Sequence, residues 1–253
     1  MTERNVEQFD ADVRANAGYL YTTNARRSSV LANRRLTDVT REMVRLQGQR
    51  VIDVGCGDGT YAHELFVSCR PAALVGVDAA AAAIAVAADR YASAVPALRF
   101  AVADVYTMPY EARSFDVAIV RGLLHHLDDA PRALAAISRL AATVLVIEPN
   151  GYNPTLKAIE RLSPYHRDHG EKSYSPRRLR GWIRALGGTI EHERYAGLVP
   201  FFCPDAMATA LKAVEPAVEA LPLARQLSCA VFCVRYGTAA PAGAAPGNES
   251  RRR

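Results

Sequence analysis

The segment from Arg50 to Thr60 carries glycines and acids at a spacing that suits the binding of a small molecule. It reads Arg-Val-Ile-Asp-Val-Gly-Cys-Gly-Asp-Gly-Thr, in which a short apolar run predicts a buried strand and the glycines predict a tight turn into a helix. Because glycine has no Cβ, the backbone at Gly55, Gly57 and Gly59 can come close to a ligand. The N–H groups of the turn and of the first helical residues then form a polar cradle for that ligand.

The glycine spacing narrows the kind of ligand. A dinucleotide fingerprint needs its third glycine one position later, where this chain has Thr60, and a P-loop needs a closing Gly-Lys-Ser/Thr, which the segment lacks. Asp53 stands at the end of the predicted strand, where a carboxylate repels a pyrophosphate but favours an ammonium or sulfonium group. These residues indicate a cationic small molecule, with an ordinary glycine-rich turn as the alternative.

Polar residues recur at the ends of the other predicted strands. The apolar segment 73–78 ends in Asp78, close to where an α/β sheet places a ribose-binding carboxylate. The side chains at or just beyond such strand ends are Asp53, Asp78, Asp104, His125, His126 and Glu148. Since the carboxyl ends of parallel strands meet at one edge, where α/β proteins bind ligands, we expect these side chains to surround one cleft.

Strands and helices alternate along the chain with short connections, which predicts right-handed βαβ units and a parallel sheet. We expect strands at 51–54, 73–78, 98–105, 114–121, 142–148, 189–195 and 227–235. We expect helices at 28–46, from 61 onward, at 79–91, from a cap at Asp128 or Asp129 to about 142, and at 153–162, 176–186 and 205–220.

One folded domain is expected over residues 28–236. Residues 1–27 are polar with interleaved aromatics, and they form either a lid that closes over a ligand or an arm packed on the surface. Residues 149–175 read as an insertion on the substrate side of the domain. The Pro/Gly/Ala-rich residues 237–253 predict a disordered tail.

Composition limits the class of protein. The chain has 253 residues, 50% of them hydrophobic, no apolar run long enough to cross a bilayer and a polar beginning unlike a signal peptide. Its five cysteines show no Cys-x-x-Cys pattern, which predicts reduced thiols and a cytoplasmic location. Of the formal charge of +5, Arg251, Arg252 and Arg253 against Glu249 supply +2 within the tail. The domain itself therefore lacks the basic excess of a nucleic-acid-binding protein.

On these residues the chain resembles the class I S-adenosylmethionine-dependent methyltransferases of the small-molecule type. Val51–Gly59 matches the first motif of that family closely, the likeness covers 50–148 by motif, and the remainder matches by element order. The resemblance implies a Rossmann-like α/β fold whose seven-stranded, mostly parallel sheet has helices on both faces. Its five parallel strands would be followed by an antiparallel hairpin, which 189–195 and 227–235 are placed to supply.

The resemblance also implies a cofactor, S-adenosylmethionine, with S-adenosylhomocysteine as its product. Asp78 matches the acid that binds the ribose hydroxyls, Asp104 and Val105 match the adenine contacts, and Arg121 and Gly122 match backbone contacts to the amino group. The cofactor-binding residues that we predict are Tyr21, Asp53, Gly55, Cys56, Gly57, Gly59, Asp78, Ala79, Asp104, Val105, Arg121 and Gly122.

Methyl transfer is an in-line displacement on a sulfonium, so positioning supplies most of the rate. A hydroxyl acceptor also needs a base, for which His125 and His126 are the candidates. Weaker alternatives for this role are His166, His169 and Tyr21. Adjacent histidines diverge in direction, so we assign no metal site.

The function predicted is methyl transfer to a small-molecule metabolite, with oxygen slightly favoured over nitrogen or carbon. Arg161, His166, Arg167, His169 and Lys172 could receive an anionic group of the acceptor or form a solvated loop, and the apolar residues at 198–202 could form an acceptor wall or ordinary core.

The main alternative is an S-adenosylmethionine-binding protein without methyl transfer, such as a sensor. A nucleic-acid methyltransferase is less favoured, because Gly-Leu-Leu-His-His stands where a Pro-Pro-Tyr-type motif would follow the fourth strand. We therefore predict a small-molecule partner and no nucleic acid, and leave a homodimer open.

Overall fold

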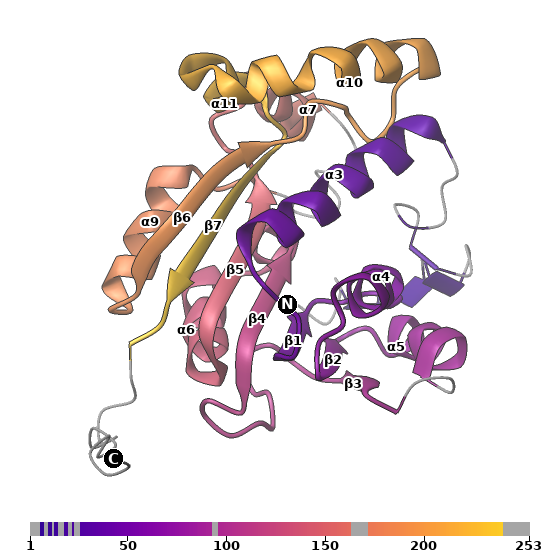
Figure 1. The fold of residues 1–253 in the computed structure, drawn as a ribbon, viewed down its shortest axis with the longest axis vertical. Helices are drawn as coiled ribbons and strands as arrows, with labels where there is room; N and C mark the ends of the chain where they lie inside the picture. The colour runs from indigo at the N-terminus through magenta and orange to yellow at the C-terminus, as the bar shows by residue number, and fades with distance from the viewer. Residues whose placement is uncertain are drawn as a thin grey trace, which may run out of the picture.

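The computed structural model describes residues 6, 7, 10, 11, 13, 14, 18, 19, 22, 26–92, 96–162 and 172–239. Seven strands form one sheet in the order β3-β2-β1-β4-β5-β7-β6 (Figure 1). The strands are β1 (Arg50–Val54), β2 (Ala73–Asp78), β3 (Leu98–Val102), β4 (Phe115–Arg121), β5 (Ala141–Pro149), β6 (Thr189–Ala196) and β7 (Val231–Gly237). The first five pair in parallel, and β7 runs antiparallel to both β5 and β6, so the predicted fold class is confirmed.

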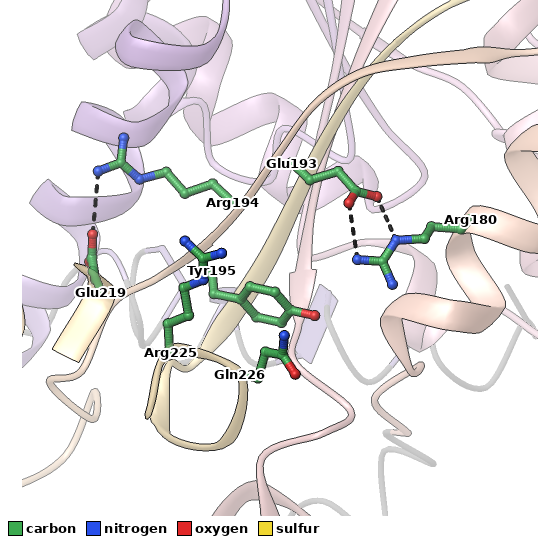
Figure 2. Close-up of a pocket in the computed structure, with 7 residues that line it drawn as sticks. All are labelled: Arg180, Glu193, Arg194, Tyr195, Glu219, Arg225 and Gln226. Carbon is green, nitrogen blue, oxygen red and sulfur yellow. Dashed lines mark hydrogen bonds and ion pairs between the residues drawn. The ribbon is translucent and has the colours of Figure 1, made fainter. Parts of the chain in front are cut away.

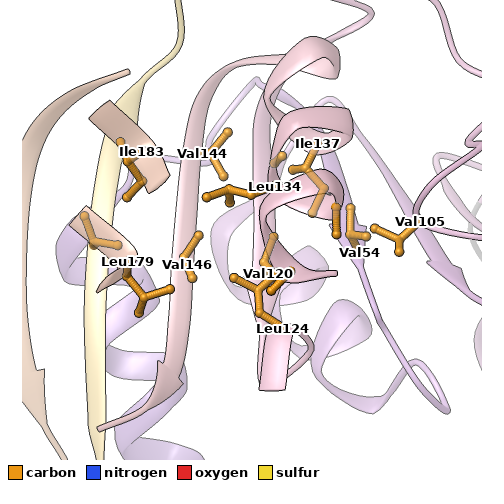
Figure 3. Close-up of a cluster of buried hydrophobic side chains, with 14 of the residues drawn as sticks. Val54, Val105, Val120, Leu124, Leu134, Ile137, Val144, Val146, Leu179 and Ile183 are labelled. Carbon is orange, nitrogen blue, oxygen red and sulfur yellow. The ribbon is translucent and has the colours of Figure 1, made fainter. Parts of the chain in front are cut away.

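Helices cover both faces of this sheet. They are α3 (Arg27–Met43), α4 (Thr60–Cys69), α5 (Ala81–Ala87), α6 (Ala130–Leu140), α7 (Pro154–Leu162), α9 (Pro176–Ala185), α10 (Asp205–Ala220) and α11 (Pro222–Ser228), with a π turn at Ala88–Ala92 and a 3₁₀ turn at Leu124–His126. The packing of α6 and α9 on one face buries a cluster that includes Val120, Leu134 and Ile183 (Figure 3). On the other face, α3 and α4 bury Val39 and Leu65 against the sheet.

The order of the strands places a topological switch point between β1 and β4. The chain leaves β1 for β2 and β3 on one side and returns to β4 on the other. Connections that diverge in this way leave a crevice at the carboxyl ends of the two strands, where α/β proteins bind their ligands. Asp53 lies next to the end of β1 and Arg121 ends β4, so both residues lie beside the switch point.

Several predicted boundaries are wrong in instructive ways. Leu227 and Ser228 belong to α11, which begins at Pro222 and which the sequence pattern did not predict, and the last strand starts at Val231. The apolar run continues across both elements, but only 231–237 has paired neighbours in β5 and β6. The predicted helix 79–91 becomes α5 followed by the π turn, and β3 ends at Val102, so Asp104 lies beyond the strand.

Other local signals are confirmed. Asp129, rather than Asp128, caps α6, because its side chain accepts a hydrogen bond from the N–H of Arg132 at 3.1 Å. Ser175 caps α9 in the same way, ahead of Pro176. None of the described helices combines the length and the apolarity needed to cross a membrane.

Candidate active site

The glycine turn after β1 adopts a conformation that only glycine reaches easily. Gly55, Gly57 and Gly59 have φ values of +80°, +56° and +75°. A Cβ added at Gly57 would lie 2.6 Å from Cε2 of Tyr19, and one at Gly59 would lie 2.7 Å from Cβ of Ala87. Gly57 therefore allows the Tyr19 ring to lie against the turn, whereas Gly59 allows α4 to begin against α5.

Asp78 connects the end of β2 to this turn. Its carboxylate accepts hydrogen bonds from the N–H of Gly57 and the N–H of Ala80, both at 2.9 Å. Burial raises the pKa of Asp78, and these two bonds act in the opposite direction. A carboxylate offers about four lone-pair sites, so Asp78 keeps acceptor capacity for hydroxyl groups of a ligand.

Asp53 is a buried acid on β1. The residue is 5% exposed, and no residue that the structure describes donates a hydrogen bond to it. Burial raises its pKa to about 7, with Arg121 lowering it and Asp78 raising it. A buried acid of this kind is best compensated by a cationic group brought in by a ligand.

The side chain of Arg121 lies close to Asp53. The family resemblance implied only a backbone contact from this residue. Its guanidinium donates to Asn33 Oδ1 at 3.0 Å and Thr37 Oγ1 at 3.3 Å, and it lies 3.8 Å from the centre of the Tyr61 ring. Burial lowers the pKa of Arg121, while the charge of Asp53 raises it. Helix α3 thus positions a cation beside the buried acid of β1.

A small recess opens at the carboxyl ends of β1 and β2. Its lining residues include Gly55, Asp78, Ala79, Asp104 and Val105, all five predicted from the sequence. The side chain of Asp104 is exposed and accepts from the N–H of Tyr106 at 3.0 Å, whereas Val105 is buried. The recess holds only about 30 Å³ for water-sized molecules, far below the roughly 300 Å³ of a small ligand pocket.

Tyr19 accounts for part of this narrowness. Its ring lies against Gly57, its N–H donates to the buried Asp58 at 3.2 Å, and the Thr22 hydroxyl donates to the same carboxylate. Burial and the charge of Asp78 raise the pKa of Tyr19, which places its phenol close to that acid. Tyr21, the tyrosine predicted for the cofactor, lies outside the described residues, so Tyr19 is the arm residue seen at the site.

His125 is held in place by Glu148 at the end of β5. The fully buried carboxylate of Glu148 accepts from the N–H groups of Leu123 at 2.9 Å, Leu124 at 2.8 Å and His125 at 3.2 Å, and lies 2.8 Å from Nδ1 of His125. Since a carboxylate that receives three N–H bonds acts as an acceptor, Nδ1 carries the hydrogen, and the lone pair of the neutral ring is therefore on Nε2. The His126 ring lies 3.9 Å from that of His125.

The remaining predicted residues are less directly involved. Cys56 turns its thiol into the core on the α3 side, where burial raises its pKa, so only its backbone belongs to the turn. Gly122 has φ +67° and donates to the carbonyl of Ile147 at 2.8 Å. Val199 packs in a core cluster with Ala208 of α10, whereas Phe202 is 45% exposed, so the structure divides the apolar residues at 198–202 between core and surface. Residues 166, 167 and 169 lie outside the described part of the chain.

Sequence reasoning missed three contributors: Asp58, Asn33 and the positioning role of Glu148. Asp58 is a polar residue between two motif glycines, which is a usable signal. Asn33 gives no comparable signal in the sequence, because it accepts a hydrogen bond from Arg121, which lies 88 positions away in the chain.

Switch-point topology, a glycine turn and acids near successive strand ends are features that α/β proteins which bind nucleosides share. Comparison with known proteins then shows which family this part of the chain is similar to. Residues 51–143, less than half of the chain, match the methyltransferase domain family. This match supports the resemblance to the class I S-adenosylmethionine-dependent methyltransferases that the sequence motifs predict.

Curated relatives share part of this chain. A phthiotriol/phenolphthiotriol dimycocerosates methyltransferase of Mycobacterium leprae is 33% identical over 113 residues, which cover 45% of this chain and 39% of the relative. An O-methyltransferase of Aspergillus nomiae is 30% identical over 138 residues, which cover 51% of this chain and 61% of the relative. The chain therefore spans between about two fifths and three fifths of the length of these relatives.

Solved structures share the fold over most of the chain. The cyclase SpnF aligns with a TM-score of 0.66 at 22% identity, covering 92% of this chain and 94% of SpnF. Magnesium protoporphyrin IX methyltransferase from Synechocystis, solved with bound S-adenosylhomocysteine, aligns with a TM-score of 0.62 at 14% identity and covers 93% and 96%. At these identities the likeness is one of fold.

Proposed function

We propose that the chain is a methyltransferase that transfers a methyl group from S-adenosylmethionine to a small molecule, with a hydroxyl acceptor slightly favoured. The observation that carries this proposal is Asp78, which two backbone N–H groups hold beside the glycine turn with acceptor capacity to spare. The match of 51–143 to a methyltransferase domain supports the same assignment.

The residues fit this cofactor by their chemistry. Asp78 would accept the ribose hydroxyls, and Asp104 with Val105 would bind the adenine end. The buried carboxyl of Asp53 suits an ammonium group, and the guanidinium of Arg121 suits a carboxylate. Bound there, S-adenosylmethionine supplies a methyl group on a positively charged sulfur.

His125 is the better placed of the two candidate bases. Glu148 orients its ring through Nδ1, so Nε2 carries the lone pair that would take the proton of an acceptor hydroxyl. His126 lies against that ring and is the second candidate. Methyl transfer neutralises the sulfonium charge, so a water-poor pocket favours it.

The names of the relatives support a small-molecule acceptor. One is named for phthiotriol and phenolphthiotriol dimycocerosates and another as an O-methyltransferase. We infer a small-molecule partner rather than nucleic acid. A cytoplasmic location accords with the five cysteines, all described and all free thiols. A homodimer remains a prediction.

Calorimetry with S-adenosylhomocysteine tests the proposal. Asp78→Ala should weaken binding about 30-fold, or about 2 kcal/mol, because it removes charged hydrogen bonds to the ligand. Asp116→Ala is the matched control, since Asp116 forms an exposed pair with Arg50 at the amino ends of β4 and β1, away from the glycine turn. Equal affinity in wild type and Asp78→Ala would remove Asp78 from the site.

A second candidate is S-adenosylmethionine binding without methyl transfer, which the cyclase SpnF favours because that protein shares this fold. A panel of hydroxylated metabolites, assayed for release of S-adenosylhomocysteine, separates the two. Tight cofactor binding with no release across the panel would favour the second candidate.

A further inference from the structure

A second cavity lies on the edge of the sheet away from the glycine turn. It has a volume of about 420 Å³ for water-sized molecules, and it lies between α9, β6 and α11 (Figure 2). Its lining residues are Arg180, Glu193, Arg194, Tyr195, Glu219, Arg225 and Gln226. Four strand steps separate β1 from β6, or roughly 19 Å, so this cavity is not part of the cofactor recess.

Two of its three arginines are neutralised within the protein. Arg180 forms a bidentate ion pair with Glu193, in which two guanidinium nitrogens donate to the two carboxylate oxygens at 2.6 and 3.0 Å. This pair raises the pKa of Arg180. Arg194 pairs with Glu42 and lies 3.5 Å from Glu219. Figure 2 shows the Arg180–Glu193 and Arg194–Glu219 pairs on opposite sides of β6.

Arg225 is different. Among the residues that the structure describes, no carboxylate lies within ion-pair distance of it, and its Nε is buried without a hydrogen-bond partner. Arg225 projects from α11 between Arg194 and Tyr195 (Figure 2). A guanidinium is always charged, so Arg225 lacks the counter-charge that Arg180 and Arg194 have. Its two terminal nitrogens are not buried as Nε is, so they are the groups that a ligand in the cavity can reach.

We propose that this cavity binds a small molecule that carries a carboxylate, which pairs with Arg225. Three arginines against two glutamates leave one positive charge on the lining, which a single carboxylate balances. The amide of Gln226 can donate to the same group. The volume is within the range of about 300–1,000 Å³ that is typical of small-molecule sites.

The site does not depend on methyl transfer. Helix α11 supplies the ligand contacts and no residue of the cofactor recess takes part. Ligand binding here and S-adenosylhomocysteine binding there are therefore separate measurements, and failure of one leaves the other standing.

Titration of the full chain with benzoate at constant ionic strength tests the proposal. The Nε–H signal of Arg225, identified in a ¹H–¹⁵N spectrum by its loss in Arg225→Gln, should shift to saturation. Calorimetric affinity for benzoate should fall about tenfold in Arg225→Gln, as expected for loss of one charged pair. Arg177→Gln is the matched control, because Arg177 is exposed on α9 and does not line the cavity.

A shift that rises linearly with benzoate, or that is equal in Arg225→Gln and wild type, would overturn the proposal. Saturation by inorganic phosphate but not by benzoate would also overturn it, by assigning the site to phosphate. Crystals of the wild-type chain soaked in 4-iodobenzoate give an answer that needs no variant. Iodine density in the cavity with the carboxylate on Arg225 would support the proposal, and iodine only elsewhere would refute it.

Discussion

Asp53 should make cofactor binding depend on pH near neutrality. With a pKa of about 7, its carboxyl is about 9% ionised at pH 6 and about 76% ionised at pH 7.5. If the ionised form is the one that binds an ammonium group, affinity should rise roughly eightfold over this interval, or about 1.2 kcal/mol. Asp53→Asn should bind more weakly at pH 7.5 and show no such rise.

Calorimetry with S-adenosylhomocysteine from pH 6 to pH 7.5 measures this dependence. Methylthioadenosine, which lacks the amino acid portion, is the control ligand and should bind equally at both ends of the range. Histidines also titrate here, so the comparison with Asp53→Asn is decisive. Wild-type affinity that stays constant, or a rise that persists in Asp53→Asn, would refute this role of Asp53.

The same pKa shift predicts a change in stability. The folded pKa of about 7 lies above the ordinary 3.8, so the folded state holds an extra proton between these values. Stability should therefore fall as pH rises from about 4 to 7, by up to about 4 kcal/mol from this group. Denaturant unfolding of Asp53→Asn, which keeps the group neutral, should lack this component.

Three further outcomes are expected. His125→Gln should lower kcat about 100-fold while changing S-adenosylhomocysteine affinity less than twofold, because the residue acts on the acceptor proton; equal losses in both would indicate a structural role. Tyr19→Ala should strengthen S-adenosylhomocysteine binding about fivefold by clearing the recess beside Gly57 and Asp78, and weaker binding would instead identify Tyr19 as a lid over bound cofactor. Arg35→Met should lower the free energy of unfolding by about 3 kcal/mol at pH 7, because it leaves Glu215 and Glu219 buried without the cation that they share. The loss should become smaller at acidic pH, where the bond to Arg35 no longer holds Glu219 ionised. A loss that stays constant with pH would contradict the electrostatic explanation.

Elements with a complete local signal are predictable from this sequence. Strand β2 matches its predicted bounds because an apolar run ends in Asp78, and α9 begins as predicted because Ser175 and Pro176 form a standard helix start. The failure at Leu227 has the opposite cause. An apolar run fits a helix or a strand, and only the hydrogen bonds of β5 and β6 decide where β7 begins.

The site divides in the same way. Strand-end positions follow from topology, so Asp78, Asp104 and Val105 are found together as predicted. Contacts between distant residues carry no local pattern. Glu148 reaches His125 across 23 positions, and Arg121 reaches Asn33 across 88, so neither partnership could be predicted from residue spacing.

Three acids at strand ends differ in how far the protein itself satisfies them. Glu148 accepts three backbone N–H bonds and faces His125, so it is committed to holding the turn after β4. Asp78 accepts two and keeps capacity for a ligand, and Asp53 accepts none from the residues that the structure describes. Because an unsatisfied buried carboxyl gains most from a new donor or cation, Asp53 should respond most strongly to bound ligand and Glu148 least. When a ligand binds, protection of the backbone amides from hydrogen exchange should therefore increase most at β1, less at β2 and least at β5. This is the order in which the three acids lack hydrogen-bond partners within the protein.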